Sequence, residues 1–317
     1  MKATVILCTF NRCERLEKAL ESVARSTLPD TVDWEVLVVD NNSSDRTPDV
    51  AKSFCQRYPG RFRYLFESQP GKSCALNAGI REAKGNVLAF TDDDVTVEPT
   101  WLQNLTASLD KGEWVGAGGR TFPEKSFSLP RWLAQGTRHT LAPLAVFDRG
   151  PEARELTEAP FGNNMAFKKG VFEKYGGFRT DLGPRPGAQD PQKSEDSEFG
   201  VRLLFAGERL WYEPSAIVYH AVPANRIQQK YFLDWWFDKA RADIRAFGIP
   251  PDAKWCIVGI PLVLFRRLAV WTLRWMVGVS PSRRFSSKLK VWSVAGEIIE
   301  CFRQSHAPRR FPVQSGF

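Results

Sequence analysis

The sequence predicts an α/β fold, a mostly parallel sheet flanked by helices, followed by a helical C-terminal region. Short apolar runs that suit buried strands alternate with segments of helical periodicity over about the first 110 residues. Such alternation implies parallel strands with right-handed crossovers, an architecture often used to bind nucleotides. After residue 225 the sequence becomes amphipathic and basic, which predicts the helical extension.

Local signals bound the first elements. Thr47 and Pro48 combine a helix cap with a first-turn proline, and Gly85 is expected to end the third helix as its C′ residue. The expected strands are 4–9, 34–39, 62–66 and 86–92, and the expected helices begin after Asn11, at Thr47, at Ser73 and at Pro99.

The pattern is less regular beyond residue 120. We interpret 116–119, which is rich in glycine, as a strand or bend that needs a close backbone approach. Residues 180–194 are expected to form a long loop of the kind that often acts as a lid. A helix should follow at 195–207, and Pro214 should separate two short strands at 209–213 and 216–220.

Composition and charge narrow the class of protein. The 317 residues are 43% hydrophobic and 25% charged, as in ordinary globular proteins. The six cysteines lack paired zinc-type spacing, so we expect neutral thiols. The N-terminus lacks the features of a signal peptide, which predicts a cytoplasmic location.

The excess of positive charge lies wholly in the C-terminal region. Residues 226–317 carry 16 Lys and Arg against 6 Asp and Glu, whereas residues 1–225 carry 28 against 30. A basic region of this kind suits either nucleic acid or an anionic membrane surface. No nucleic-acid recognition motif accompanies it, so we expect no nucleic-acid partner.

Three adjacent carboxylates, Asp92, Asp93 and Asp94, follow the fourth expected strand. The carboxyl ends of parallel strands are where ligands bind in open α/β sheets. The repulsion among the three charges calls for a counter-charge, which a divalent cation with substrate phosphates would supply. Alone, the triplet would more often be a solvated acidic turn.

Three further groups should converge on the same sheet edge. Asp40 follows the second strand, Lys72 opens a helix, and Glu195 with Asp196 opens a late helix. The alternative interpretation of Lys72 is a lysine exposed on the surface. The alternative for Glu195 and Asp196 is that their negative charges merely stabilise the N-terminus of a helix.

Taken together, these motifs resemble the family 2 glycosyltransferases, which have the GT-A fold. The matching segments occur in the family's order across about the first 220 residues. They are 9–12, 38–47, 71–80, 90–94, 162–167, 176–178 and 195–199.

The resemblance implies a nucleotide-sugar donor, with a UDP-sugar as the family default, and an inverting reaction. Asp40 would accept a hydrogen bond from the base. Asp92 would lie toward the ribose or a Mg²⁺ or Mn²⁺ ion, and Asp94 would bind that metal, which would bridge the diphosphate. The remaining residues implied for the donor site are Thr9, Asn11, Arg12, Lys72, Asn77 and Asp93.

The same resemblance implies roles in catalysis and acceptor binding. Asp196, next to Glu195, would be the base that takes the proton from the acceptor hydroxyl. Asn164 and Met165 would line the pocket for the sugar and acceptor, with core packing as the alternative for Met165. His220 would be a metal ligand, as in some GT-A enzymes, or simply a histidine at a strand end.

The C-terminal region, 226–317, follows the expected catalytic domain at 1–225, whose nucleotide half is about 1–120 and acceptor half 121–225. Residues 229–247 should form an amphipathic helix. The segment 255–290 is rich in Trp and Arg, and neither of its two apolar halves, 255–265 and 268–279, reaches the ~20 residues of a spanning helix. We therefore expect it to lie on an anionic membrane surface. A helical hairpin packed on the catalytic domain or on a dimer partner is the alternative.

These features predict transfer of one sugar to a lipid-linked or saccharide acceptor in bacterial cell-surface polysaccharide or glycolipid synthesis, at the inner face of the cytoplasmic membrane. One alternative is a sugar-phosphate nucleotidyltransferase, although no glycine-rich triphosphate loop is visible. Another is a degenerate sugar-binding or lipid-binding module.

Overall fold

The computed structural model describes residues 1–110, 113–125, 130–133, 142–187, 193–249 and 255–306. It divides into two compact units. The first consists of Met1–Phe127 and Leu141–Pro223, and the second of Ser128–Thr140 and Ala224–Phe317.

The first unit is built on a mixed, mostly parallel sheet. Among the described residues, nine strands form it in the order β3-β2-β1-β4-β8-β6-β9-β5, with β7 paired to β9. The strands are β1 Lys2–Thr9, β2 Asp33–Asp40, β3 Phe62–Phe66, β4 Val87–Asp92, β5 Val95–Val97, β6 Gly116–Pro123, β7 Arg154–Leu156, β8 Met165–Lys168 and β9 Leu210–His220. Strands β1 to β4 pair in parallel, as predicted from the early alternation.

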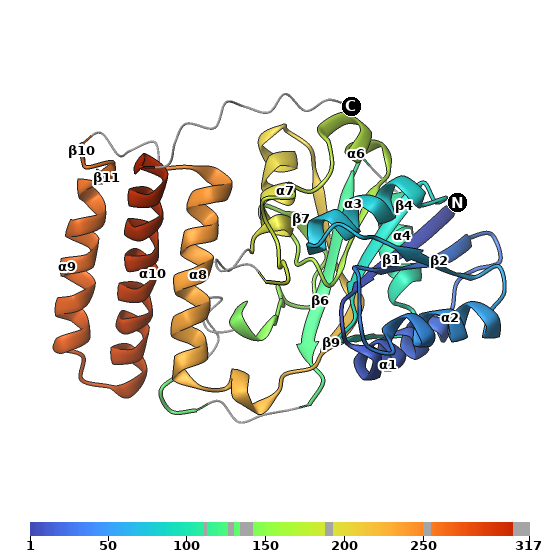
Figure 1. Ribbon diagram of the computed structural model, residues 1–317, viewed down its shortest axis with the longest axis horizontal. Coiled ribbons are helices and arrows are strands. Elements are labelled where there is room, and N and C mark those ends of the chain that lie inside the picture. Colours follow the sequence, from blue (N-terminus) through green and yellow to red (C-terminus); the bar gives the residue numbers. More distant parts are fainter. Residues whose placement is uncertain (111–112, 126–129, 134–141, 188–192, 250–254, 307–317) are drawn as a thin grey trace. The chain divides into compact units, whose positions relative to one another are not determined.

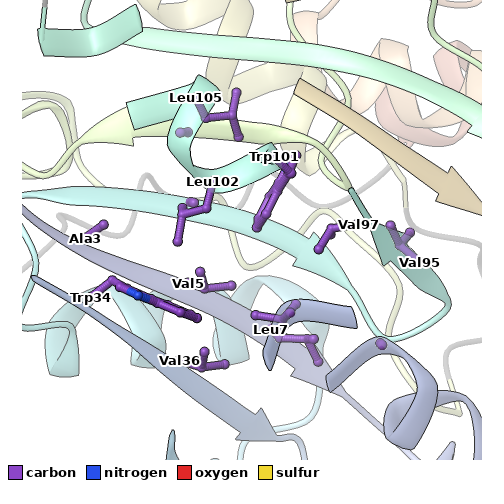
Figure 2. Packing of buried hydrophobic residues seen from close by; sticks show 14 of the residues in the cluster. Ala3, Val5, Leu7, Trp34, Val36, Val95, Val97, Trp101, Leu102 and Leu105 are labelled. Atoms are coloured by element: carbon purple, nitrogen blue, oxygen red, sulfur yellow. The ribbon is translucent and has the colours of Figure 1, made fainter. Parts of the chain in front are cut away.

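Helices cover both faces of this sheet (Figure 1). Apolar residues of α1, α2 and α4 pack in one cluster with alternate residues of β1, and those of α3, α6 and α7 pack in a second cluster with Ile6. Figure 2 shows Ala3, Val5 and Leu7 along β1 in the first cluster. The helices are α1 Cys13–Ala24, α2 Thr47–Arg57, α3 Lys72–Glu82, α4 Trp101–Asp110, α6 Gly170–Tyr175 and α7 Glu195–Phe205, with a 3₁₀ turn at Ala142–Leu144.

Two local predictions were wrong. Pro214 does not split the last strand, because β9 runs unbroken from Leu210 to His220. The pairing of β9 with β6 shifts register between Gly119 and Arg120. Pro214 lies in this irregularity, where the absence of a backbone N–H is tolerated. Helix α3 ends at Glu82, before Gly85.

Two glycines permit a close backbone approach. A Cβ on Gly85 would lie 2.5 Å from the backbone nitrogen of Thr4, so Gly85 allows contact with β1 and does not cap the helix. A Cβ on Gly119 would lie 2.0 Å from the carbonyl oxygen of Ala216. The prediction of a close-approach strand at 116–119 is therefore confirmed.

The second unit is helical. Its elements are a 3₁₀ turn at Ala224–Arg226, α8 Gln229–Phe247, the short strands β10 Cys256–Ile257 and β11 Ile260–Pro261, α9 Leu262–Met276 and α10 Pro281–His306. Within this unit α10 packs against both α8 and α9 (Figure 1). Arg241 and Arg245 of α8 hold Glu300 of α10 through ion pairs of 3.2 and 2.6 Å.

Trp132 also belongs to the second unit, where it packs edge-on against Phe232 and Phe285. Across the described ranges, no helix combines the length and the apolar character that a membrane crossing requires.

Candidate functional site

Three parallel strands bring their carboxyl ends side by side at one edge of the sheet. In the ladder, Thr9 of β1 lies opposite Asp40 of β2, and Cys8 lies opposite Asp92 of β4. The alternation of buried strands and crossover helices therefore places the strand-end residues together, as the sequence predicts.

Arginines supply counter-charge to the carboxylate triplet. Arg12 Nη1 lies 2.9 Å from Asp93 Oδ1 and 3.0 Å from Asp94 Oδ2, and Arg15 Nη1 lies 3.7 Å from Asp94. Arg15, in the first turn of α1, is three residues beyond Arg12, which precedes the helix, and this spacing could have revealed Arg15 in the sequence. The acidic triplet is thus a partly buried ion-pair network rather than a solvated turn.

Burial perturbs the middle carboxylate. Asp93 is only 5% exposed, and burial raises its pKa to about 6. The charge of Arg12 acts to lower this pKa, and the charge of Asp94 acts to raise it further. This carboxylate therefore gains a proton close to neutral pH, unlike an ordinary surface aspartate.

His220 lies next to the last residue of the triplet. The antiparallel pairing of β5 with β9 places Val95 opposite His220, whose Nε2 is 3.6 Å from Asp94 Oδ1. The imidazole is buried. Asp94 and His220 are far apart in the sequence, so they meet only because β5 pairs with β9.

Lys72 connects the triplet with the start of α7. Its Nζ lies 2.6 Å from Asp92 Oδ1 and 3.8 Å from Glu195 Oε1, and its side chain is only 23% exposed. Burial acts to lower the pKa of Lys72, but attraction to Asp92 and then Glu195 outweighs it, so the pKa is raised. The alternative of an exposed surface lysine was therefore wrong.

The loop before α7 packs on the first turn of α3. The backbone N–H of Lys72 donates to the carbonyl of Pro184 at 2.8 Å, and the Ser73 hydroxyl donates to the carbonyl of Leu182 at 2.8 Å. The beginning of the long loop predicted at 180–194 is thus fixed beside the site, while 188–192 lie outside the described residues.

Glu195 and Asp196 differ in environment. Glu195 is 6% exposed, and burial, followed by repulsion from Asp196, raises its pKa to about 7. Asp196 Oδ2 accepts from the backbone N–H of Gly162 at 2.8 Å, and its Oδ1 accepts from the N–H of Ser197 at 2.6 Å. These bonds fix the orientation of the Asp196 carboxylate.

Two residues predicted for the nucleotide pocket organise the loops after β1 and β2. Asn11 has a left-handed backbone (φ 50°), and its Oδ1 accepts from the N–H of Ser44 at 2.7 Å. Asp40 is fully buried and accepts from the N–H of Ser43 at 3.0 Å and from the Tyr64 hydroxyl at 2.8 Å. Because Asp40 is fully buried, a base could contact its carboxylate only after the groups that cover it had moved.

The amide of Asn77 is committed to the backbone. Its Nδ2 donates to the carbonyl of Phe178, and its Oδ1 accepts from the N–H of Phe178, both at 2.8 Å. The structure therefore gives Asn77 a role in holding the turn at Gly177, and a nucleotide contact would require these bonds to be exchanged.

Asn164 and Met165 are each 1% exposed. The Asn164 Oδ1 accepts from the indole N–H of Trp101 at 2.8 Å, and its Nδ2 donates to the carbonyls of Arg120 and Ala216. Met165 packs in the second apolar cluster, which agrees with the core-packing alternative. Both residues support the strands behind the site.

Part of the donor set for a divalent metal is present. Carboxylate oxygen suits Mg²⁺ and Mn²⁺, and imidazole extends the choice to transition metals. Asp94 and His220 are close enough for one ion to bind both, whereas Asp92 is paired with Lys72. In the part of the chain that the structure describes, no group of three or more His, Cys, Asp or Glu side chains is arranged to hold a metal.

Comparison with known proteins places this chain in a family. The model of glycosyl transferase family 2 matches residues 4–176, more than half of the chain. The probable glycosyltransferase YdaM of Bacillus subtilis is 27% identical over 76% of this chain and 54% of its own. The succinoglycan biosynthesis protein ExoM of Rhizobium meliloti is 28% identical over 69% of this chain and 67% of its own. The chain thus spans about half the length of the first of these relatives.

A solved structure has a similar fold. The mannosyltransferase PcManGT from Pyrobaculum calidifontis, in complex with GDP-Man and Mn²⁺, superposes with a TM-score of 0.62 over 94% of this chain and 86% of its own, at 20% identity. The fold is the GT-A fold, with a helical C-terminal segment. From the family match over residues 4–176, this chain belongs to glycosyl transferase family 2.

Proposed function

We propose that the chain transfers a sugar, with inversion, from a nucleotide-sugar to an acceptor hydroxyl. The observation that carries the proposal is the meeting of Asp92, Lys72 and Glu195 at one sheet edge, with Asp196 next in the chain. This brings groups suited to a diphosphate and groups suited to proton transfer into one cluster.

Asp196 acts as the base. The acceptor O–H bond breaks as its proton passes to the carboxylate, the acceptor oxygen bonds to the anomeric carbon, and the bond to the nucleotide diphosphate breaks with its electron pair. The hydrogen bond from Gly162 holds the carboxylate in one orientation. Attack opposite to the leaving diphosphate inverts the anomeric centre.

The cations of the site bind the leaving diphosphate. Lys72 and Arg12 pair with carboxylates in this structure, and each can exchange that partner for phosphate oxygen. Asp94 and His220, with Asp92, would hold Mg²⁺ or Mn²⁺, which when bound neutralises charge on the diphosphate.

We propose a UDP-sugar or GDP-sugar donor and a lipid-linked or saccharide acceptor in cell-surface polysaccharide or glycolipid synthesis. The GDP-Man bound to PcManGT supports the GDP-sugar, and the name of ExoM, a succinoglycan biosynthesis protein, supports polysaccharide synthesis. We further propose that the protein works at the inner face of the cytoplasmic membrane.

The test is nucleotide release by the full chain from UDP-, GDP- and dTDP-sugars, with acceptor fractions added. Asp196→Asn should reduce turnover by at least about 1,000-fold and leave donor affinity within about threefold, because the base acts only in the transition state. Asp110→Asn, at an exposed position on α4, is the matched control and should have no effect. Retained turnover in Asp196→Asn, or a large loss of donor affinity, would remove Asp196 as the base.

A further inference from the structure

The outer side of α9 is an apolar surface without a partner among the described residues of the second unit. Leu273 is 61% exposed, Met276 71% and Val277 65%, and Val279 in the turn that follows is 97% exposed. Only Leu264 of α9 is fully buried. Leu262, Phe265, Leu273 and Met276 recur at helical spacing, so the exposed side chains share one side of the helix.

Cations are concentrated in the segment that carries this surface. Residues 255–290 contain seven Lys and Arg and no Asp or Glu. One of them, Arg267, is neutralised by Glu297 at 2.8 Å. Arg274 lies over the Trp271 ring at 4.7 Å, as does Lys290 at 3.9 Å. Burial, followed by repulsion from Arg274 and Arg267, lowers the pKa of Lys290, as expected for cations gathered without enough anions.

Arg274 in the last turn of α9 and Arg284 in the first turn of α10 lie on either side of the turn that joins these helices. A Cβ on Gly278 would lie 3.1 Å from the Cα of Arg284 and 3.2 Å from the carbonyl oxygen of Arg274. The beginning of α10 therefore touches the end of α9, and the apolar tip of Met276, Val277 and Val279 has basic residues beside it.

We propose that α9 and the turn after it dock on an anionic lipid bilayer, with the apolar side among the acyl chains near the headgroups and the cations on lipid phosphates. Aromatic and apolar residues interleaved with arginine suit this interface. A symmetric contact between two copies would bring these cations together, since the same patch meets itself across a twofold axis. Charge complementarity therefore favours lipid over a second copy.

The helix would lie along the surface. Fifteen residues of α9 are fewer than the ~20 that a spanning helix needs. Docking would hold the protein where a lipid-linked acceptor resides, a use that rests on the proposed function, but the docking itself requires no sugar transfer.

The experiment is co-sedimentation of the full chain with phosphatidylcholine vesicles, with and without phosphatidylglycerol, in the absence of any sugar donor. Binding should require the anionic lipid. Leu273→Asp with Met276→Asp should abolish it, and Phe205→Asp, at a residue 88% exposed in the first unit, should not.

A second set of variants tests the cations. Each cation near an anionic surface contributes about fivefold to binding. Replacing Arg266, Arg283 and Arg284, which are exposed and lie next to the apolar side chains in the sequence, with Gln should therefore weaken binding about 100-fold. The same change at Lys18, Arg25 and Lys174 of the first unit should have little effect.

Equal binding to both vesicle types, or none to either, would overturn the proposal. So would a dimer in sedimentation velocity that the Leu273→Asp and Met276→Asp changes dissociate, because that result would assign the surface to a second copy. If the full chain bound vesicles but transferred no sugar, that result would count against the proposed function alone.

Discussion

Replacing Glu195 with Gln should stabilise the protein at pH 8. Glu195 is 6% exposed and lies beside Asp196, with Lys72 3.8 Å away as a partner cation. Burial and the neighbouring carboxylate raise its pKa from 4.5 to about 7. A neutral amide of the same shape removes the cost of ionising a carboxyl in this position.

The sign follows from proton linkage. Because the pKa is higher in the folded chain, the folded state holds this proton more tightly than the unfolded state does. The contribution of Glu195 to the free energy of unfolding is fully present below about pH 4.5 and is lost as the pH rises through about 7. At about 1.4 kcal/mol per pH unit, the ionised carboxylate costs about 3 kcal/mol at pH 8.

The assay is equilibrium urea denaturation of the parent and Glu195→Gln chains at pH 4.5 and pH 8. The two should agree within about 1 kcal/mol at the lower pH, and the variant should be more stable by about 2–3 kcal/mol at the higher pH. Glu198→Gln is the matched control on the same helix. It loses a bidentate pair with Arg202 and should destabilise the chain at pH 8. A Glu195→Gln chain less stable than the parent at pH 8, or an equal difference at both pH values, would refute the reasoning.

Three further changes test other parts of the structure. Arg12→Gln removes one cation from Asp93 and Asp94, so Mn²⁺ should bind more tightly without nucleotide and the nucleotide diphosphate should bind more weakly. Calorimetry measures both, and tighter nucleotide binding would contradict this. Gly119→Ala should lower the free energy of unfolding by at least about 2 kcal/mol, because the new Cβ would meet Ala216. Gly170→Ala is the control, because a Cβ there has open space, and equal melting temperatures for the two variants would contradict this. Glu300→Gln should lower the free energy of unfolding by about 3 kcal/mol, because Arg241 and Arg245 lose their buried carboxylate partner. Unchanged urea denaturation would contradict this.

The sequence predicted the parallel part of the sheet because its buried strands are continuous apolar runs. Their carboxyl ends necessarily meet at one edge, so Asp40 and Asp92 could be placed near each other from the sequence alone. The basic character of the C-terminal region was equally visible, because it depends only on composition.

What could not be predicted depends on pairing between distant segments. The contact between Asp94 and His220 arises from the antiparallel β5–β9 pair. The contact between Lys72 and Glu195 joins α3 to a helix more than 100 residues further along the chain. Asn164 matches a pocket motif, but its hydrogen bond with Trp101 shows that it supports the strands. Polar residues in a motif can serve either purpose, and only their partners distinguish the two.

The central claim is that one sheet edge binds a nucleotide diphosphate together with a metal. The most direct measurement is a thermal-shift panel of UDP, GDP and dTDP, each with and without Mn²⁺, on the parent and on Asp94→Asn. At about a hundredfold excess over the dissociation constant, a ligand adds about 2.7 kcal/mol, or roughly 5 °C or more for a unit of this size. The account predicts a metal-dependent shift with one nucleotide that Asp94→Asn abolishes. A shift that is the same in Asp94→Asn, or no shift with any nucleotide, would contradict it.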